Sequence, residues 1–388
     1  MLDAIVVGAG PSGAVLAYLL ARRGMQVLLL EKASLPRYKT CGGGVSWKAM
    51  QNLPFDANQV YEYAARGGIL TYKGEELMRT ELGWPVAWTV MRSNFDHFLV
   101  QRAVQAGAQL LDGVTVQGIE QDAASISVHS TQGNFQARLL AGGDGVNSTV
   151  ARSLGLLNHR KTGAGLEAEV AVSEAGIEAQ SSFATFDFGA LPHGYGWIFP
   201  KRDHLSVGVF HASSTKAPDL RQALDKFIAS QPILRGAKML HVHGHRIPLG
   251  GGRHRLHQGR ALLVGDAANL ADAWMGEGIY YAILSARLAA EVMYAALRDV
   301  RLDLSDYTRQ VHQLITPMLA QARQFAALVY ALPEVCSVML GSSPWMQEVL
   351  FSALRGNRTY RQMISNLIIG APRIFAEMVV SAIKQVSR

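Results

Sequence analysis

A glycine-rich segment near the N-terminus carries the residues best suited to bind a nucleotide. Gly8, Gly10 and Gly13 lie between the apolar run Ala4 to Val7 and a stretch rich in alanine and leucine. Gly8 would allow a tight turn, Gly10 would let a pyrophosphate approach the backbone, and Gly13 would let a helix pack closely on a strand. Glu31 ends a second apolar run and is placed to accept hydrogen bonds from a ribose diol. The pattern predicts a strand, a turn, a helix and a second strand that bind a dinucleotide.

Two later aspartates follow glycines in similar surroundings. Asp144 lies in the segment GGDGVNS, which again reads as strand, glycines and helix, and Asp266 follows the buried-type strand 261–264. A strand that ends in Gly-Asp places a carboxylate where a ribose or ribitol hydroxyl can bind it. Gly276 and Gly278 precede a long predicted helix, so their backbone N–H groups can face an anionic ring edge.

A loop with three consecutive glycines follows Cys41, and it has two interpretations. Glycines remove side chains where a ligand must pass close to the backbone, which predicts a loop that lines a redox site with Cys41 near the reacting atoms. The other interpretation is a small buried thiol before a flexible turn. The spacing favours the loop at the site and the buried thiol for Cys41.

A helix is predicted from Arg92, with Ser93 or Asn94 as its N-cap. Arg92, at the entrance of this helix, is either a ligand for a phosphate or a flavin ribityl chain, or a surface arginine.

Alternating residues mark two strands in the middle of the chain. Tyr195, Trp197 and Phe199 share one strand face by the period of two, and they form either plain core or the wall of a pocket for a long apolar ligand. His241, His243 and His245 also alternate. No carboxylate or cysteine lies near these histidines in sequence, so the pattern does not favour a metal site.

Length and composition predict a compact globular protein of two or three domains, and the pattern of strand, glycine turn and helix predicts the fold class α/β. The chain has 388 residues, of which 49% are hydrophobic and 17% charged. We expect a discontinuous nucleotide-binding domain (1–66, 90–165 and 249–295), an inserted, mostly antiparallel β-sheet domain that binds substrate (67–89 and 166–248), and a C-terminal helical region (296–388) broken at its prolines.

The two cysteines give no disulfide framework, which fits a reducing, cytoplasmic compartment. The first strand leaves no room for a signal peptide, and no window reaches the ~20 apolar residues of a spanning helix. From Arg355 onward six basic residues face one acid, so the last 34 residues carry +5 of the net +7. Large apolar residues lie between these charges, which indicates either peripheral contact with an anionic membrane or an ordinary packed helix. Nucleic acid is not favoured, because no binding motif accompanies the charge.

Three motifs occur in order: GAGPSG with Glu31, GGDGVNS, and LLVGDAA. Together they resemble the FAD-dependent oxidoreductases of the para-hydroxybenzoate hydroxylase-like type, with a Rossmann-like FAD-binding domain. The stretches PRYKTCGGG (36–44) and YGWIFP (195–200) are similar to the geranylgeranyl reductase family. In that family a YxWxFP strand lines the substrate cavity and a cysteine-glycine loop lies beside the flavin. One departure is that Pro36 lies two residues, not three, before Tyr38.

The resemblance implies FAD in an extended pose. The glycines of the first motif would hold the pyrophosphate, Glu31 the adenosine ribose, and Asp266 the ribityl or pyrophosphate region. Arg92 would support the ribityl side, and Asp144 would organise the cofactor fold. The full set predicted to bind the cofactor is Gly8, Gly10, Pro11, Ser12, Gly13, Glu31, Lys32, Arg37, Cys41, Gly42, Gly43, Arg92, Val116, Asp144, Gly265, Asp266, Gly276, Gly278 and Ile279.

The function implied is reduction of isoprenoid carbon–carbon double bonds by reduced FAD. Such double bonds are not conjugated to a carbonyl, so an acid must deliver a proton and the site must be dry. Tyr195, Trp197 and Phe199 would wall the site, and Cys41 and Tyr195 are candidate proton donors on position only.

Two alternatives stay open. One is an FAD-dependent monooxygenase of an aromatic or lipid substrate, which would consume oxygen and leave a hydroxyl; the other is a non-catalytic, flavin-bound protein of the membrane surface. A halogenase is not favoured, because the sequence has no WxWxIP stretch. NADPH and ferredoxin are both possible electron donors. No motif specifies the head group of the isoprenoid, the number of double bonds reduced or the oligomeric state.

Overall fold

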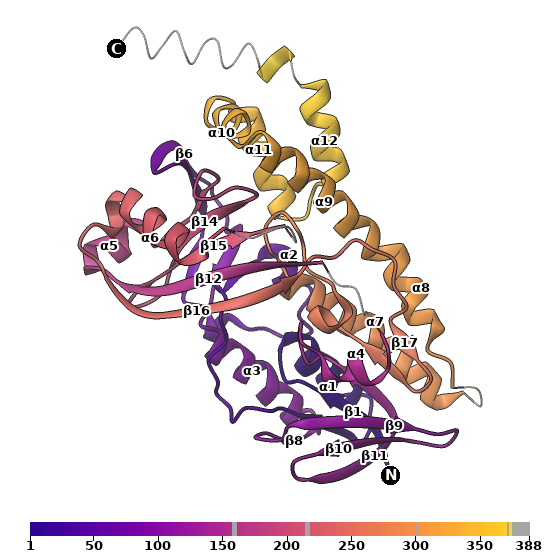
Figure 1. Ribbon diagram of the computed structural model, residues 1–388. Coiled ribbons are helices and arrows are strands. Elements are labelled where there is room, and N and C mark those ends of the chain that lie inside the picture. The colour runs from indigo at the N-terminus through magenta and orange to yellow at the C-terminus, as the bar shows by residue number, and fades with distance from the viewer. Residues whose placement is uncertain (157–160, 214–217, 300–301, 371, 375–388) are drawn as a thin grey trace, which may run out of the picture.

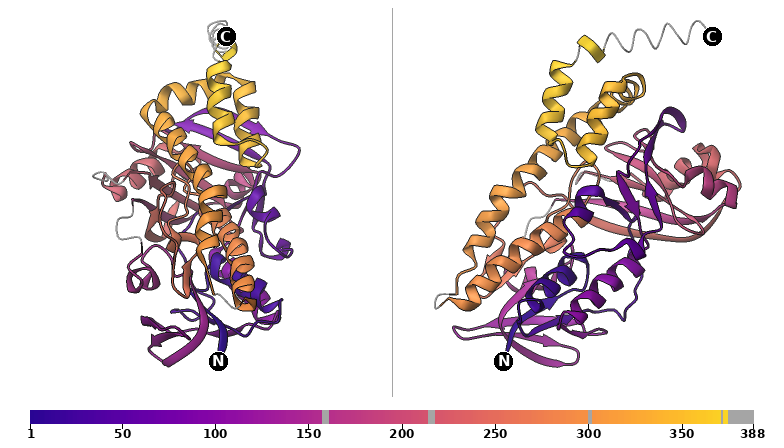
Figure 2. Two further views of the ribbon diagram at one scale, coloured as in Figure 1. Left: turned by 90° about the vertical axis from the view of Figure 1, so that its right-hand side faces the viewer. Right: turned by 180° about the vertical axis from the view of Figure 1, so that it is seen from behind.

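The computed structural model describes residues 1–156, 161–213, 218–299, 302–370 and 372–374. Within them the chain forms two sheets, a small third sheet and a set of C-terminal helices (Figures 1 and 2). The predicted fold class, α/β with a Rossmann-like domain, an inserted antiparallel sheet and a C-terminal helical region, is confirmed. The division into domains by residue number stays a prediction.

The first sheet has the order β17-β18-β11-β1-β2-β8, and β10 and β9 extend it from β11. The strands β18, β11, β1, β2 and β8 run parallel. Their sequences are continuous apolar runs because a parallel sheet is covered on both faces. The bounds are β1 (Leu2–Val7), β2 (Val27–Leu30), β8 (Gln109–Leu111), β9 (Val116–Gln121), β10 (Ile126–Ser130), β11 (Gly133–Gly142), β17 (His257–Gln258) and β18 (Ala261–Leu263).

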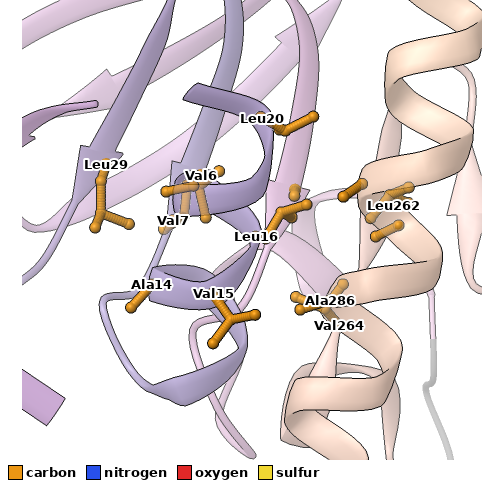
Figure 3. Close-up of a cluster of buried hydrophobic side chains, with 14 of the residues drawn as sticks. Val6, Val7, Ala14, Val15, Leu16, Leu20, Leu29, Leu262, Val264 and Ala286 are labelled. Carbon is orange, nitrogen blue, oxygen red and sulfur yellow. The ribbon is translucent and has the colours of Figure 1, made fainter. Parts of the chain in front are cut away.

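Helix α1 (Pro11–Ala21) packs on β1 and β2 of this sheet, and α3 (Arg92–Gln105) and α7 (Ile279–Arg298) pack against α1. Figure 3 shows the side chains of α1 gathered with those of β1, β18 and α7. Leu16 and Leu20 of α1 and Ala286 of α7 are fully buried. This packing holds the start of α1 rigidly above the carboxyl end of β1. Short helices follow at α2 (Trp47–Gln51), η1 (Asn58–Val60), α4 (Thr149–Ser153) and η3 (Gly265–Ala268).

The second sheet has the order β16-β12-β15-β14-β13-β5-β6 and is antiparallel except where β13 pairs with β5. Its bounds are β5 (Gly67–Tyr72), β6 (Glu75–Glu81), β12 (Thr162–Ala171), β13 (Phe183–Asp187), β14 (Gly194–Pro200), β15 (Leu205–His211) and β16 (Lys238–Pro248). The helices that accompany it are α5 (Glu174–Gln180), α6 (Leu220–Ser230) and η2 (Pro232–Leu234).

Two local expectations were wrong. The strand β7 (Ala87–Thr89), expected in the substrate sheet, instead pairs with β3 (Gly44–Ser46) and β4 (Tyr63–Ala65) in the small third sheet. Helix α3 begins directly at Arg92, after Met91, and among the described side chains none caps it, so neither Ser93 nor Asn94 is the N-cap. An ion pair between Arg92 and Asp96, one turn apart, stabilises this first turn instead.

The C-terminal helices are α8 (Ser305–Leu314), α9 (Thr316–Ala331), α10 (Pro333–Ser342), α11 (Pro344–Leu354) and α12 (Tyr360–Ile369). Prolines stand in the first turn of α9, α10 and α11, where the missing N–H has no helical partner to lose. Helices α8 and α9 run along one side of the molecule to the end farthest from the N-terminus, where α10 to α12 gather (Figures 1 and 2). No single described helix is long and apolar enough to cross a membrane. Ser305–Ala331 and Pro333–Ser342 meet the length and composition criteria only as a pair, bent by 96°.

Candidate active site

A cavity of about 940 Å³ connects the parallel sheet, the second sheet and the C-terminal helices. This volume is near the top of the roughly 300–1,000 Å³ range of small-molecule sites. The lining runs from the glycine turn before α1, past the loop of Cys41 and strand β14, to the turn between α11 and α12. It therefore joins the predicted cofactor residues and the predicted aromatic wall in one space.

The glycine turn has the geometry of a phosphate site. Gly8 has φ +96°, and a Cβ added there would lie 2.4 Å from the carbonyl oxygen of Gly143. A Cβ on Gly10 would meet only the Arg37 guanidinium, at 3.9 Å, so the backbone faces open space. Helix α1 starts next, and no described side chain caps its first N–H groups. These groups are available to a pyrophosphate, so the residues fit the cofactor.

Glu31 and two arginines form a buried ionic network beside this turn. Glu31 accepts a hydrogen bond from the N–H of Ala9 at 2.8 Å and pairs with Arg37 at 3.3 Å. Arg37 also pairs with Asp96 at 3.1 Å, and Arg92 pairs with the other oxygen of Asp96 at 2.8 Å. Burial opposes the charge on Arg92, but Asp96 and Cys41 keep its pKa raised. Sequence reasoning missed Asp96, although its spacing of four from Arg92 on a helix is a signal for such a pair.

Asp144 shapes the turn that follows β11. Its carboxylate accepts hydrogen bonds from the Ser148 hydroxyl at 2.5 Å and from the N–H groups of Thr149 and Val150 at 2.7 and 3.1 Å. Burial raises the pKa of Asp144 in spite of these bonds. The carboxylate lines the cavity while it holds the start of α4, which suits the organising role expected of it.

The structure brings the predicted site residues together, apart from two glycines. Gly13 and Gly265 do not line the cavity. A Cβ on Gly13 would lie 1.8 Å from the oxygen of Gly8, and one on Gly265 would lie 2.7 Å from the Ser12 hydroxyl. Both serve close packing rather than ligand contact. The predicted residues that do line the cavity are Gly8, Gly10, Pro11, Ser12, Glu31, Lys32, Arg37, Cys41, Gly42, Gly43, Arg92, Val116, Asp144, Tyr195, Trp197, Phe199, Asp266, Gly276, Gly278 and Ile279.

Two buried residues of the second sheet hold the cysteine loop, and neither was predicted. Glu167 on β12 accepts a hydrogen bond from the Cys41 N–H at 2.7 Å. The Lys201 ammonium, directly after β14, donates to the carbonyls of Gly42 and Val90 at 2.9 and 2.7 Å. The loop thus depends on residues more than a hundred positions away in sequence.

The aromatic residues of β14 face the cavity as expected. Tyr195 and Trp197 are 5% and 7% exposed, and Phe199 is half-buried. The Tyr195 hydroxyl donates to the Met275 carbonyl at 2.5 Å, in the loop before Gly276. The Trp197 indole N–H donates to the Ser206 hydroxyl at 3.3 Å. That hydroxyl donates to Glu167 at 2.7 Å. The wall and the cysteine loop therefore share one anchor.

The alternating histidines of β16 have separate surroundings. His245 lines the cavity, whereas the ring of His243 lies 4.4 Å from that of Tyr38. Across the described ranges there is no group of three metal-ligating side chains.

The buried Lys201 predicts a pH dependence of stability. Burial lowers its pKa to about 8, partly offset by Glu167 and Cys41, whereas an unfolded lysine titrates near ~10.4. Between these values the unfolded chain binds more protons, so the free energy of unfolding rises with pH, by up to about 1.4 kcal/mol per pH unit. Urea unfolding of the FAD-loaded protein at pH 7.5 and 9.5 measures this. Lys201→Met should reduce this dependence of the free energy of unfolding on pH. Part of the dependence should remain, because burial also lowers the pKa of Lys39 to about 8. A slope that Lys201→Met leaves unchanged contradicts the assignment.

Fold and site together define an FAD-dependent oxidoreductase of the para-hydroxybenzoate hydroxylase-like type, and residues 1–322 match the FAD binding domain family. Over 318 residues the chain is 31% identical to digeranylgeranylglycerophospholipid reductase 1 of Methanopyrus kandleri, covering 76% of this chain and 81% of that protein. The chain belongs to the geranylgeranyl reductase family of these flavoenzymes.

Solved structures show the same fold. A geranylgeranyl bacteriochlorophyll reductase-like protein of Thermoplasma acidophilum superposes with a TM-score of 0.76 at 22% identity, over 97% of this chain and 98% of that one. The flavin-dependent brominase Bmp2 superposes with a TM-score of 0.72 at 18% identity, over 96% and 99%. The fold alone therefore does not decide the reaction.

Proposed function

We propose that this protein reduces carbon–carbon double bonds of an isoprenoid chain at its FAD site. The observation that carries the proposal is the aromatic wall of β14, which shares one cavity with the glycine turn and the cysteine loop. A reductase of unconjugated double bonds needs a dry apolar surface against the cofactor, and Tyr195, Trp197 and Phe199 supply it. The related reductase from Methanopyrus kandleri supports this reaction class.

When bound and reduced, FAD supplies a hydride, and a proton must reach the neighbouring carbon, so each double bond gains two hydrogens. The side chains of this protein hold the isoprenoid, exclude water and position the proton donor. Tyr195 serves as wall rather than acid in this proposal, because burial raises its pKa and its proton is directed at Met275. Cys41 stays the predicted proton donor: its thiol lines the cavity, and its sulfur accepts a hydrogen bond from the Gly43 N–H at 3.3 Å.

The test is anaerobic reoxidation. FAD-loaded protein is reduced chemically and mixed with geranylgeranyl diphosphate, and the flavin absorbance and product mass are followed. We expect the absorbance spectrum of oxidised flavin to return and the product to gain two hydrogens per double bond. Reoxidation only by oxygen, with a hydroxylated product, would support the monooxygenase, and no response to any lipid would support the surface interaction protein. The same assay with NADPH and with reduced ferredoxin identifies the electron donor.

We also propose that the protein is cytoplasmic and that its C-terminal helices contact an anionic membrane surface. Leu332 and Val335, at the junction of α9 and α10, are 52% and 49% exposed, and Ile368 and Ile369 of α12 are 71% and 78% exposed. Both sites lie at the end where α10 to α12 gather (Figure 2), and the exposed Arg361 and Arg373 add positive charge. Of the basic tail, Lys384 and Arg388 lie outside the described residues.

Vesicle binding tests this contact. Burial of one isoleucine is worth ~1.5–3 kcal/mol, so Ile368→Ser with Ile369→Ser should weaken co-sedimentation with phosphatidylglycerol vesicles at least about tenfold. Leu314→Ser is the matched control, because Leu314 is 52% exposed and its helix, α8, lies away from that end (Figure 1). Equal binding of the parent and the double variant to the vesicles would contradict the proposed membrane contact.

A further inference from the structure

We propose that Arg355 and Arg358 bind the phosphate of an anionic isoprenoid head group. Both side chains line the cavity, in the turn between α11 and α12. The inference rests on the proposed function and deepens it, because it separates phosphate-bearing substrates from isoprenoids with an uncharged head, such as a quinone.

The cavity reaches the surface at this turn. Gly356 and Thr359 of the turn and Gln51 of α2 are exposed, yet all three line the cavity. The turn packs directly on α2, since a Cβ added to Gly356 would lie 3.2 Å from the Cβ of Lys48. A polar head group can therefore stay hydrated at this rim while a chain extends inward.

Two aromatic rings hold Arg355 in place, and its side chain donates no hydrogen bond to another described residue. The centre of its guanidinium lies 4.3 Å from the ring centroid of Trp84 and 5.1 Å from that of Trp47. Stacking on aromatic faces orients an arginine and leaves its N–H groups free for bidentate contact with phosphate. In the described ranges, neither Arg355 nor Arg358 has a carboxylate partner.

Three other cations of the cavity differ in this respect. Arg37 and Arg92 are paired with Asp96, and Lys48 is paired with Glu277 at 2.5 Å. Lys32 and Lys39, in the loop that follows β2, also line the cavity and have no ion pair within the described ranges. Among the residues that the structure describes, no carboxylate therefore neutralises the positive charge of the rim arginines. A phosphate group would supply a negative charge opposite these arginines, whereas an uncharged head group would not.

Apolar residues connect the rim to the aromatic wall. Val86, Ala87, Phe186 and Leu354 all line the cavity. The ring of Phe186 lies 5.6 Å from that of Tyr195 and 5.5 Å from that of Phe199. A chain anchored by its phosphate at the rim would therefore cross apolar surface until it reaches the wall of β14.

The experiment compares two ligands that share the same isoprenoid chain, one with a diphosphate and the other with an uncharged hydroxyl. Oxidised, FAD-loaded protein is titrated with geranylgeranyl diphosphate and with geranylgeraniol, for the parent, the double variant Arg355→Gln with Arg358→Gln, and Arg361→Gln. Arg361 is exposed on α12 and does not line the cavity, which makes it the matched control. Hydrogen bonds to charged groups are stronger than those between neutral groups. We therefore expect the double variant to raise the Kd for the diphosphate at least ~10-fold more than the Kd for the alcohol. Inorganic pyrophosphate should compete with the diphosphate in the parent and not in the double variant.

Several results would overturn the inference: an unchanged Kd for the diphosphate, equal losses for both ligands, or the same loss in Arg361→Gln. Loss of binding only to phosphatidylglycerol vesicles would assign these arginines to the membrane surface instead. A glycerophosphate-linked isoprenoid, titrated in parallel, shows whether a lipid phosphate or a diphosphate binds more tightly, and dependence of either on the two arginines supports the site. Binding is measured without turnover, so the two proposals can fail separately. If the protein binds the diphosphate through these arginines but its reduced flavin is not reoxidised by it, this inference stands and the reductase proposal is refuted.

Discussion

Replacement of Glu167 by leucine is expected to lower the free energy of unfolding by roughly 3 kcal/mol or more, the loss typical of buried donors left without an acceptor. Glu167 is only 3% exposed. It accepts hydrogen bonds from the Cys41 N–H and the Ser206 hydroxyl, both at 2.7 Å, and from the more distant Tyr38 hydroxyl at 3.4 Å. Leucine would fill much of the space and accept none of them. Urea unfolding of the FAD-loaded protein measures the effect.

The same substitution should also slow the reaction, because Glu167 joins the cysteine loop to the aromatic wall. Displacement of either by about 1 Å is enough to lower a rate ~100-fold, so kcat for geranylgeranyl diphosphate should fall by one to two orders of magnitude. Glu167→Gln keeps one acceptor oxygen, so its losses should be smaller. The control is Glu169→Leu, two residues along the same face of β12, half-buried and outside the cavity lining. Equal effects at 167 and 169 would show that Glu167 is not a specific anchor.

The parts of this site that sequence reasoning predicted are those encoded by short spacings. Gly8, Gly10 and Glu31 lie within one strand-turn-helix-strand unit, so local rules for turns and helix starts were sufficient to find them. The period of two placed Tyr195, Trp197 and Phe199 on one face of β14. The prolines of the C-terminal helices stand where those helices begin.

Two of the residues that were missed act through partners distant in sequence. Glu167 and Lys201 look like ordinary charged residues until the fold brings the cysteine loop against the second sheet. The assignment of β7 to the wrong sheet has the same cause, because a strand of three residues is too short to specify its partner by pattern alone. The turn at Arg355 likewise becomes the rim of the cavity only when it packs on α2. Asp96 differs from the other missed residues, because its partner Arg92 lies only four residues away on the same helix.

Replacement of Gly208 by alanine is expected to reduce kcat/KM for an isoprenoid substrate about 100-fold, through displacement of Trp197. Gly208 lies directly opposite Trp197 across the β14–β15 pair. A Cβ there would lie 2.2 Å from the Trp197 ring and 2.7 Å from the carbonyl oxygen of Leu166. Gly42 also lies close to the indole, because a Cβ on it would lie only 2.7 Å from the ring nitrogen. The ring must therefore shift within the wall of the cavity, and overpacking of this kind costs ~1–3 kcal/mol of stability.

A double-mutant cycle separates this effect from a general loss of folding. The smaller ring of Trp197→Phe should relieve the clash, so Gly208→Ala with Trp197→Phe should be more stable than the sum of the single changes predicts, by at least about 1 kcal/mol. Gly244→Ala on β16 is the control, because its nearest neighbour would be 3.6 Å away, an ordinary contact. Steady-state kinetics and urea unfolding on all four variants decide the matter. Additive single effects, or an equal loss in Gly244→Ala, would mean that Gly208 does not make room for the indole, and that the position of Trp197 in the wall depends on other contacts.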